Sequence, residues 1–110
     1  MLILRVFAIF VFLVIAVYTA LVVTHHVPFF LPTFVSDILS VSWSGQFNLD
    51  FMGYLLTSAL WLAWRHGFSV AGIVLALIAS VGGMLFFAPY LLYATVNASD
   101  LRTVVLGVNR

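Results

Sequence analysis

The sequence FNLDFMGYLLTSALWLAWRHG, residues 47–67, decides the fold of this chain. Its acidic residue, Asp50, and its arginine, Arg65, are separated by 14 uncharged residues. A helix rises about 1.5 Å per residue, so the two charges lie about 22 Å apart along it, within a hydrocarbon layer about 30 Å thick. The segment therefore predicts a membrane-crossing helix over about residues 48–65, with its charged ends at or just inside the two interfaces.

The composition of the whole chain indicates the same environment. Of 110 residues, 65% are hydrophobic and only 6% are charged, which leaves too little polar surface to cover a soluble monomer. The net charge is +1, with four arginines and no lysine, so the chain lacks the concentrated basic surface that nucleic acid requires. The absence of cysteine excludes disulfides and thiolate metal sites. We expect a single transmembrane domain, 1–110, whose first partner is the lipid bilayer.

An uncharged run precedes the central segment and predicts a first crossing over about residues 3–25. It covers residues 6–24, directly after Arg5. A cleaved signal peptide is the alternative, but the run is long for one, and Tyr18 stands where a cut after Ala20 would need a small residue. Pro28 disfavours helical geometry at the residue before it, so the helix should end near His25.

The region between the first two crossings is apolar but interrupted by prolines, glycine and polar residues. An irregular backbone in hydrocarbon leaves amide groups unpaired, which argues against a crossing here. We expect a short helix lying in the interface over about residues 32–44, with a re-entrant loop as the alternative. The third uncharged run, residues 68–99, predicts a helix over about 68–96 that is kinked near Pro89, followed by a short tail, 97–110.

The expected fold is thus an all-α membrane protein with three transmembrane helices. The turn made by Arg65, His66 and Gly67 is very short, so the second and third helices should form a tight antiparallel hairpin. Small residues let helix backbones approach closely in lipid, where hydrophobicity gives no preference for protein over lipid. The small residues expected to pack this hairpin are Gly53, Thr57 and Ser58 on the second helix and Gly72, Ala76, Ala79, Ser80 and Gly83 on the third.

Three crossings would place the N-terminus and the turn at residues 65–67 on one side of the membrane. The long connection has no arginine or lysine, so the positive-inside rule favours a cytoplasmic N-terminus. Several aromatic and basic residues should anchor the helices at the interfaces, namely Trp43, Trp61, Trp64, Arg65 and His66. The same topology gathers the remaining polar residues at the opposite interface, namely His25, His26, Asp37, Asn48, Asp50, Asn97, Asp100 and Arg102.

Asp50 is the strongest functional candidate, because an acid on the protein-facing side of a membrane helix is a candidate proton or cation site. The structural alternative is that it lies in the first turn of the helix, where the helix dipole favours an anion. The other candidate polar residues are Asn48, His25 and His26. Adjacent histidines point about 100° apart on a helix and cannot chelate one ion together, so no metal site and no cofactor is predicted.

The stretch FNLDFMGYLLTSALWLAWRHGFS, with YLL after Pro89 and VVLG near the end, resembles small bacterial integral membrane proteins of uncharacterised function. In these proteins an FN-x-D stretch leads into a helix that ends in a W-x-x-W-R pattern. The resemblance implies a multi-pass protein of the bacterial inner membrane with three helices, and it transfers no activity.

No nucleophile triad, phosphate-binding loop or metalloprotease signature is present, so we do not expect an enzyme. The sequence favours a non-enzymatic membrane component that works by helix packing, either with copies of itself as a homo-oligomer or with a membrane-protein partner. The alternative is a proton- or cation-coupled transport or permeation subunit that uses Asp50.

Overall fold

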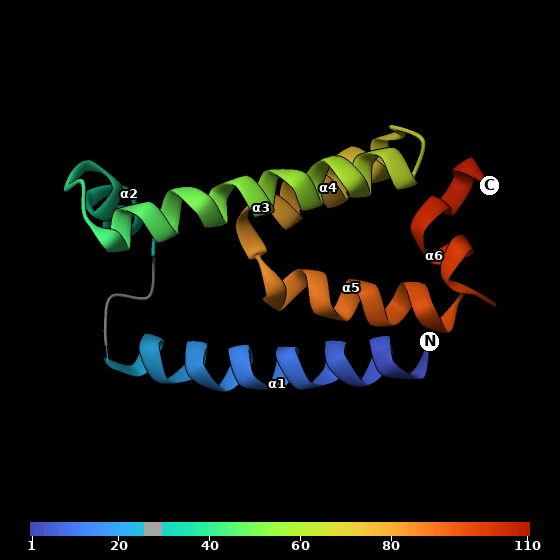
Figure 1. Cartoon of the computed structure of the whole chain (residues 1–110), viewed down its shortest axis with the longest axis horizontal. Helices are drawn as coiled ribbons and strands as arrows, with labels where there is room; N and C mark the ends of the chain where they lie inside the picture. Colours follow the sequence, from blue (N-terminus) through green and yellow to red (C-terminus); the bar gives the residue numbers. More distant parts are fainter. Residues whose placement is uncertain (26–29) are drawn as a thin grey trace.

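The computed structural model describes residues 1–25 and 30–110, and every regular element in these ranges is helical (Figure 1). The all-α prediction is therefore confirmed for the described part of the chain. The elements are α1 (Leu2–His25), α2 (Leu31–Leu39), α3 (Trp43–Arg65), α4 (Val70–Gly82), α5 (Met84–Val96), α6 (Leu101–Leu106) and a 3₁₀ turn, η1 (Gly107–Asn109).

Two long helices, α1 and α3, run the length of the molecule (Figure 1). At about 1.5 Å per residue they are about 36 and 34 Å long. α3 begins five residues earlier than the sequence predicts, because Ser42 caps it: the Ser42 hydroxyl oxygen accepts a hydrogen bond from the backbone N–H of Gly45 at 3.2 Å. The short helix before it, α2, accordingly ends at Leu39 and does not reach residue 44.

The expected third helix is wrong in one important respect, because it is two helices of 13 residues each, α4 and α5. The break lies at Gly83, whose φ of +56° is in the left-handed region that glycine enters without strain. Pro89 lies inside α5 and does not end it. In Figure 1 α5 turns back at this break and runs towards the end of the molecule where α3 finishes. The chain therefore changes direction at Gly83 and not at Pro89, and it reverses where the sequence predicts only a kink.

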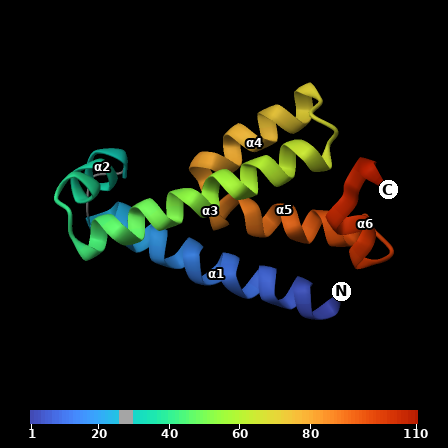
Figure 2. The same cartoon turned by 45° about the horizontal axis from the view of Figure 1, so that its top comes forward.

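This reversal sets the arrangement of the elements. α4 packs against α3, α5 packs against α1, and α2 packs against the beginning of α3 (Figures 1 and 2). Both chain termini lie at the end of the molecule where α3 finishes, and η1 contacts α3 there (Figure 2). The expectation that residues 97–102 gather with His25 and Asp50 is thus wrong, since they lie at opposite ends of the helices.

The core is built from small side chains. The buried hydrophobic residues in the described ranges include five alanines, and Leu62 and Thr95 are the largest side chains that are fully buried. Large apolar side chains instead cover the surface; Ile3, for example, is 85% exposed. By length and composition, one helix in the described ranges, α1, is sufficiently long and apolar to cross a membrane.

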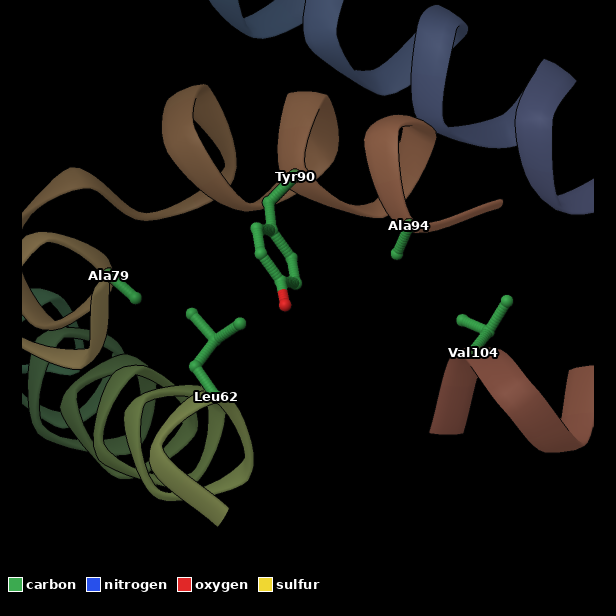
Figure 3. Close-up of a cluster of buried hydrophobic side chains, with 5 residues drawn as sticks. All are labelled: Leu62, Ala79, Tyr90, Ala94 and Val104. Atoms are coloured by element: carbon green, nitrogen blue, oxygen red, sulfur yellow. The ribbon is translucent and has the colours of Figure 1, made fainter. Parts of the chain in front are cut away.

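A cluster of Leu62, Ala79, Tyr90, Ala94 and Val104 joins α3, α4, α5 and α6 (Figure 3). The Tyr90 side chain extends from α5 towards Leu62 on α3 (Figure 3). This cluster fixes the returning helix and the C-terminal segment to the end of α3.

Polar contacts surround the same cluster. The Tyr90 hydroxyl accepts a hydrogen bond from Arg65 Nη1 at 2.9 Å and lies 2.6 Å from His66 Nε2. Arg65 Nε also donates to the carbonyl of Val104 at 2.6 Å. Arg65 and His66, which the sequence predicts as interfacial anchors, are half-buried and both reach the Tyr90 hydroxyl, because α5 returns and brings Tyr90 to them. Burial, and then the charge of Arg65, lower the pKa of His66 from its ordinary value, which favours the neutral imidazole over the imidazolium.

Candidate functional site

A groove of about 560 Å³ lies between α3 and the reversal that joins α4 to α5. This volume, and a lining that is mostly apolar with a few polar groups, are typical of small-molecule sites. The groove is lined by Phe47, Asp50, Phe51, Tyr54, Leu55, Thr57, Ser58 and Trp61 from α3 and by Gly83, Met84 and Phe87 from the reversal and α5.

The polar side of α3 forms one wall of this groove. Helical spacing places Asp50, Tyr54, Thr57 and Trp61 along one face of α3, and all four line the groove. The sequence predicts that this face is turned towards protein, with Gly53, Thr57 and Ser58 packing against the third helix. Gly53 does not make the contact predicted for it, because a Cβ atom added there would meet no heavy atom within 4 Å beyond its own helix backbone and chain neighbours. The predicted pairing of Gly53 with α4 is therefore wrong.

The reversal forms the opposite wall. A Cβ atom on Gly83 would lie 3.2 Å from the ring of Phe51 and 3.7 Å from a methyl group of Leu55, so the backbone of the reversal touches the middle of α3. Further along, the rings of Trp61 and Phe87 meet edge to face with centroids 5.6 Å apart. This aromatic pair closes the end of the groove that is nearer Arg65.

Asp50 is the only charged residue among the described residues that line the groove. Its carboxylate makes no hydrogen bond or ion pair with residues 1–25 or 30–110 at the distances that define such contacts. The hydroxyl groups of Thr57 and Ser58 do not reach it, since they donate to the carbonyls of Gly53 at 2.9 Å and Leu55 at 2.7 Å. The groove thus contains a carboxylate without a partner in the described chain.

The position of Asp50 within α3 tests whether the helix dipole explains an acidic residue there. α3 begins at Trp43, so Asp50 is seven residues, or about 10 Å, beyond the helix start. The favourable effect of a helix dipole on an anion falls off within the first turn. The dipole therefore does not account for the carboxylate, which is on an exposed residue at the open side of the groove.

The other candidate polar residues do not join Asp50 in the groove. Asn48 Nδ2 donates to the carbonyl of Phe34 at 3.2 Å and so links α3 to α2. His25 is the exposed last residue of α1 and is not part of the lining, and His26 lies outside the described residues. In residues 1–25 and 30–110, no three His, Asp or Glu side chains are grouped so that they could hold a metal ion.

The small residues predicted for the third helix are used within the chain. Gly72 and Ala79 are buried, and Ala76 and Ser80 are half-buried. A Cβ atom on Gly72 would lie 2.8 Å from His66 Cβ and 3.3 Å from the carbonyl oxygen of Ala63. This part of the predicted stripe therefore packs α4 against the end of α3.

Three of the interfacial predictions concern tryptophans. Trp43 is exposed at the start of α3, and Trp64 is 36% exposed near its end. Trp61 is half-buried, and its Nε1–H donates to the carbonyl of Val105 at 3.1 Å. Trp61 therefore holds the C-terminal segment while its ring lines the groove.

Two residues shape the site in ways that the sequence does not predict. Gly83 forms the wall of the groove as a chain reversal, and Tyr90 anchors the returning helix. The adjacent pair Gly82 and Gly83, at the centre of an uncharged run of 32 residues, is the signal in the sequence for the reversal. Comparison with protein-family models, curated proteins and solved structures finds no match to this chain.

Proposed function

We propose that the chain is an integral membrane protein that crosses the bilayer twice, with α1 and α3, and enters it a third time with α4 and α5 as a hairpin. Each arm of the hairpin has 13 residues, or about 20 Å of helix, which is too short for a hydrocarbon core about 30 Å thick. The contact of Gly83 with Phe51 and Leu55 supports a hairpin tip beside the middle of α3.

The charges support this topology. Arg5 is in the first turns of α1, Arg65 ends α3, and Arg102 and Arg110 follow the returning helix, so all four arginines belong to one side. The positive-inside rule then makes that side, with both termini, cytoplasmic. Three crossings would instead divide the arginines equally between the two sides.

Single cysteines introduced into this cysteine-free chain test the topology. Leu2→Cys and Asn109→Cys should react with an impermeant thiol reagent from the same side of sealed vesicles, and Val41→Cys should react from the other side. Labelling of residues 2 and 109 from opposite sides would overturn the two-crossing topology and restore three crossings.

Within this membrane protein, the function that the geometry supports best is binding of a cation at Asp50, as part of a transport or permeation subunit. The observation that carries this proposal is the partnerless carboxylate in the groove of the described chain. An ionised acid costs about 2.5 to 3.5 kcal/mol at the centre of a membrane helix on insertion scales and less nearer its ends, where Asp50 lies, and acids within membrane helices mark ion or substrate pathways. A bound cation would offset that cost.

Paired carboxamide substitutions test the cation site. Asp50→Asn should abolish binding of organic cations to the protein in lipid vesicles, measured by displacement of a fluorescent cation. Asp37→Asn is the matched control, because Asp37 carries the same charge on α2 and is outside the groove lining. Equal binding by the wild type and Asp50→Asn would overturn the proposal.

Assembly through helix packing is the second candidate. The observation that favours it is a shallow hollow on the face of α1 that is turned away from α5, lined by Phe10, Leu13, Val14, Val17, Tyr18 and Leu21. A second copy of the chain would seat the same face against this hollow. Val14→Cys should then form a disulfide-linked dimer in the membrane, whereas Ala8→Cys, at a buried position of α1, should not. No dimer from Val14→Cys would exclude this interface.

A further inference from the structure

We infer that the cation bound at Asp50 is the headgroup of a single-chain amphiphile, which enters the groove sideways from the lipid. This inference rests on the proposed cation site and names the class of its ligand.

The oxygen atoms of the groove do not suit a metal ion. Ca²⁺ takes six to eight oxygen ligands, and Mg²⁺ requires near-octahedral geometry. The lining side chains offer one carboxylate, from Asp50, and the hydroxyl groups of Tyr54, Thr57 and Ser58. Those of Thr57 and Ser58 donate to carbonyls of their own helix, which leaves their lone pairs available, but these side chains together still offer fewer than six oxygens. An organic cation such as an ammonium group, whose nitrogen already carries covalent substituents, needs fewer oxygen ligands from the protein.

The aromatic rings next to Asp50 suit such an organic cation. Phe47, Phe51 and Tyr54 line the groove within about one helical turn of the carboxylate. The negative faces of aromatic rings attract cations, and quaternary ammonium groups are recognised in this way. A carboxylate together with aromatic side chains therefore favours an ammonium headgroup.

The rest of the groove suits an apolar chain. From Asp50 to Trp61 there are eleven residues along α3, or about 16 Å. Beside the hydroxyl groups, the walls are formed by apolar side chains, including Leu55, Met84 and Phe87. A headgroup at Asp50 would direct its chain along α3 towards Trp61.

The groove is open along its side. Tyr54, midway along α3, is 72% exposed although it lines the groove. In the proposed topology the tip of the hairpin lies within the bilayer, so this opening faces lipid chains and not water. A ligand dissolved in the membrane can therefore reach Asp50 without crossing an aqueous path.

Fluorescence of Trp61 tests the inference directly. In the full chain carrying Trp43→Phe and Trp64→Phe, Trp61 is the only tryptophan and lies at the far end of the groove. Dodecyltrimethylammonium with a nitroxide on its chain, added to protein in phosphatidylcholine vesicles, should quench this fluorescence saturably. Nitroxide-labelled dodecanol at the same bilayer content controls for quenching by chains that are merely dissolved in the lipid.

Three further substitutions locate the binding. Asp50→Asn should abolish the saturable quenching, and Asp37→Asn should retain it. Thr57→Phe should weaken the quenching with the carboxylate intact, because the larger ring would fill part of the groove. Far-UV circular dichroism shows whether each variant folds. If Asp50→Asn does not fold, the result for Thr57→Phe decides the outcome.

Unlabelled competitors separate this inference from the cation site itself. The free aqueous concentration that displaces half of the probe should fall by about fourfold for each methylene added between octyl- and dodecyltrimethylammonium, the equivalent of about 0.8 kcal/mol, because each methylene raises the content of competitor in the bilayer from which the groove is entered. If tetramethylammonium displaces the probe as well as the dodecyl compound, and Asp50 is still required, the amphiphile is excluded and the cation site stands. Equal quenching by dodecanol and by the cation in wild type and Asp50→Asn would overturn both.

Discussion

One added methyl group at Gly72 and one at Gly53 should change the stability of this protein in opposite directions. The Cβ atom of Gly72→Ala would lie 2.8 Å from His66 Cβ, whereas carbon atoms pack at about 3.5 to 4.0 Å, so α4 must move away from the end of α3. The Cβ atom of Gly53→Ala would meet nothing within 4 Å beyond its own helix backbone and chain neighbours. The two positions therefore separate tight packing from open space.

The expected magnitudes follow from two opposing terms. Replacing glycine by alanine inside a helix stabilises it by up to about 1 kcal/mol, and this gain applies to both variants. Overpacking costs about 1 to 3 kcal/mol and applies only to Gly72→Ala. The helix term largely cancels in the comparison, so Gly72→Ala should be about 1 to 3 kcal/mol less stable than Gly53→Ala.

Unfolding by sodium dodecyl sulfate of the protein in a mild detergent, followed by tryptophan fluorescence, measures this difference. Gly53→Ala should unfold at or above the dodecyl sulfate fraction required by the wild type, and Gly72→Ala below it. Equal midpoints for the two glycine variants would refute the close packing of α4 on α3.

Three further predictions use the same unfolding measurement. Gly83→Ala should destabilise the fold by about 1 to 2 kcal/mol, because φ is +56° there and Phe51 is 3.2 Å from the added carbon; an unchanged midpoint would argue against the reversal. Tyr90→Phe should cost about 1 to 3 kcal/mol, since Arg65 and His66 lose their shared hydroxyl, and a loss equal to that of Tyr93→Phe would contradict this role. Because the folded state lowers the pKa of His66, the unfolded chain binds more protons as the pH falls below about 6.5, and stability should fall in that range. His66→Gln should remove most of this pH dependence, and its persistence would assign the titration to another group.

The two long helices could be predicted from charge alone. Asp50 and Arg65 bracket most of α3, and the uncharged run after Arg5 becomes α1, which covers Leu2–His25. The predicted bounds of these helices differ from the observed ones mainly where a capping side chain fixes a helix terminus, as the Ser42 hydroxyl does at the start of α3.

The reversal could not be predicted from hydropathy, because hydropathy reports which residues tolerate lipid and not the direction of the chain through it. A run of 32 uncharged residues is compatible with one long kinked helix and with two short arms. Pro89 predicts a kink, yet α5 continues through it, and the deciding residue is Gly83 with its left-handed backbone.

The sequence predicts which residues lie on the polar face of α3, but it does not predict what this face contacts. Helical spacing groups Asp50, Tyr54, Thr57 and Trp61, and the structure places all four on the groove. Whether such a face meets a neighbouring helix or a cavity depends on where the hairpin tip ends. That position follows from the reversal. A prediction that continues one helix through Gly83 therefore also misplaces the opposite wall of the groove.

The hairpin has a consequence for how the chain is inserted during synthesis. In the proposed topology, the only stretch that must be exported is the connection between α1 and α3, residues 26–42, which contains no arginine or lysine and has Asp37 as its single acid. Every guanidinium group stays in the compartment where the ribosome made it. Biogenesis therefore never requires an arginine side chain to be pulled through the hydrocarbon layer.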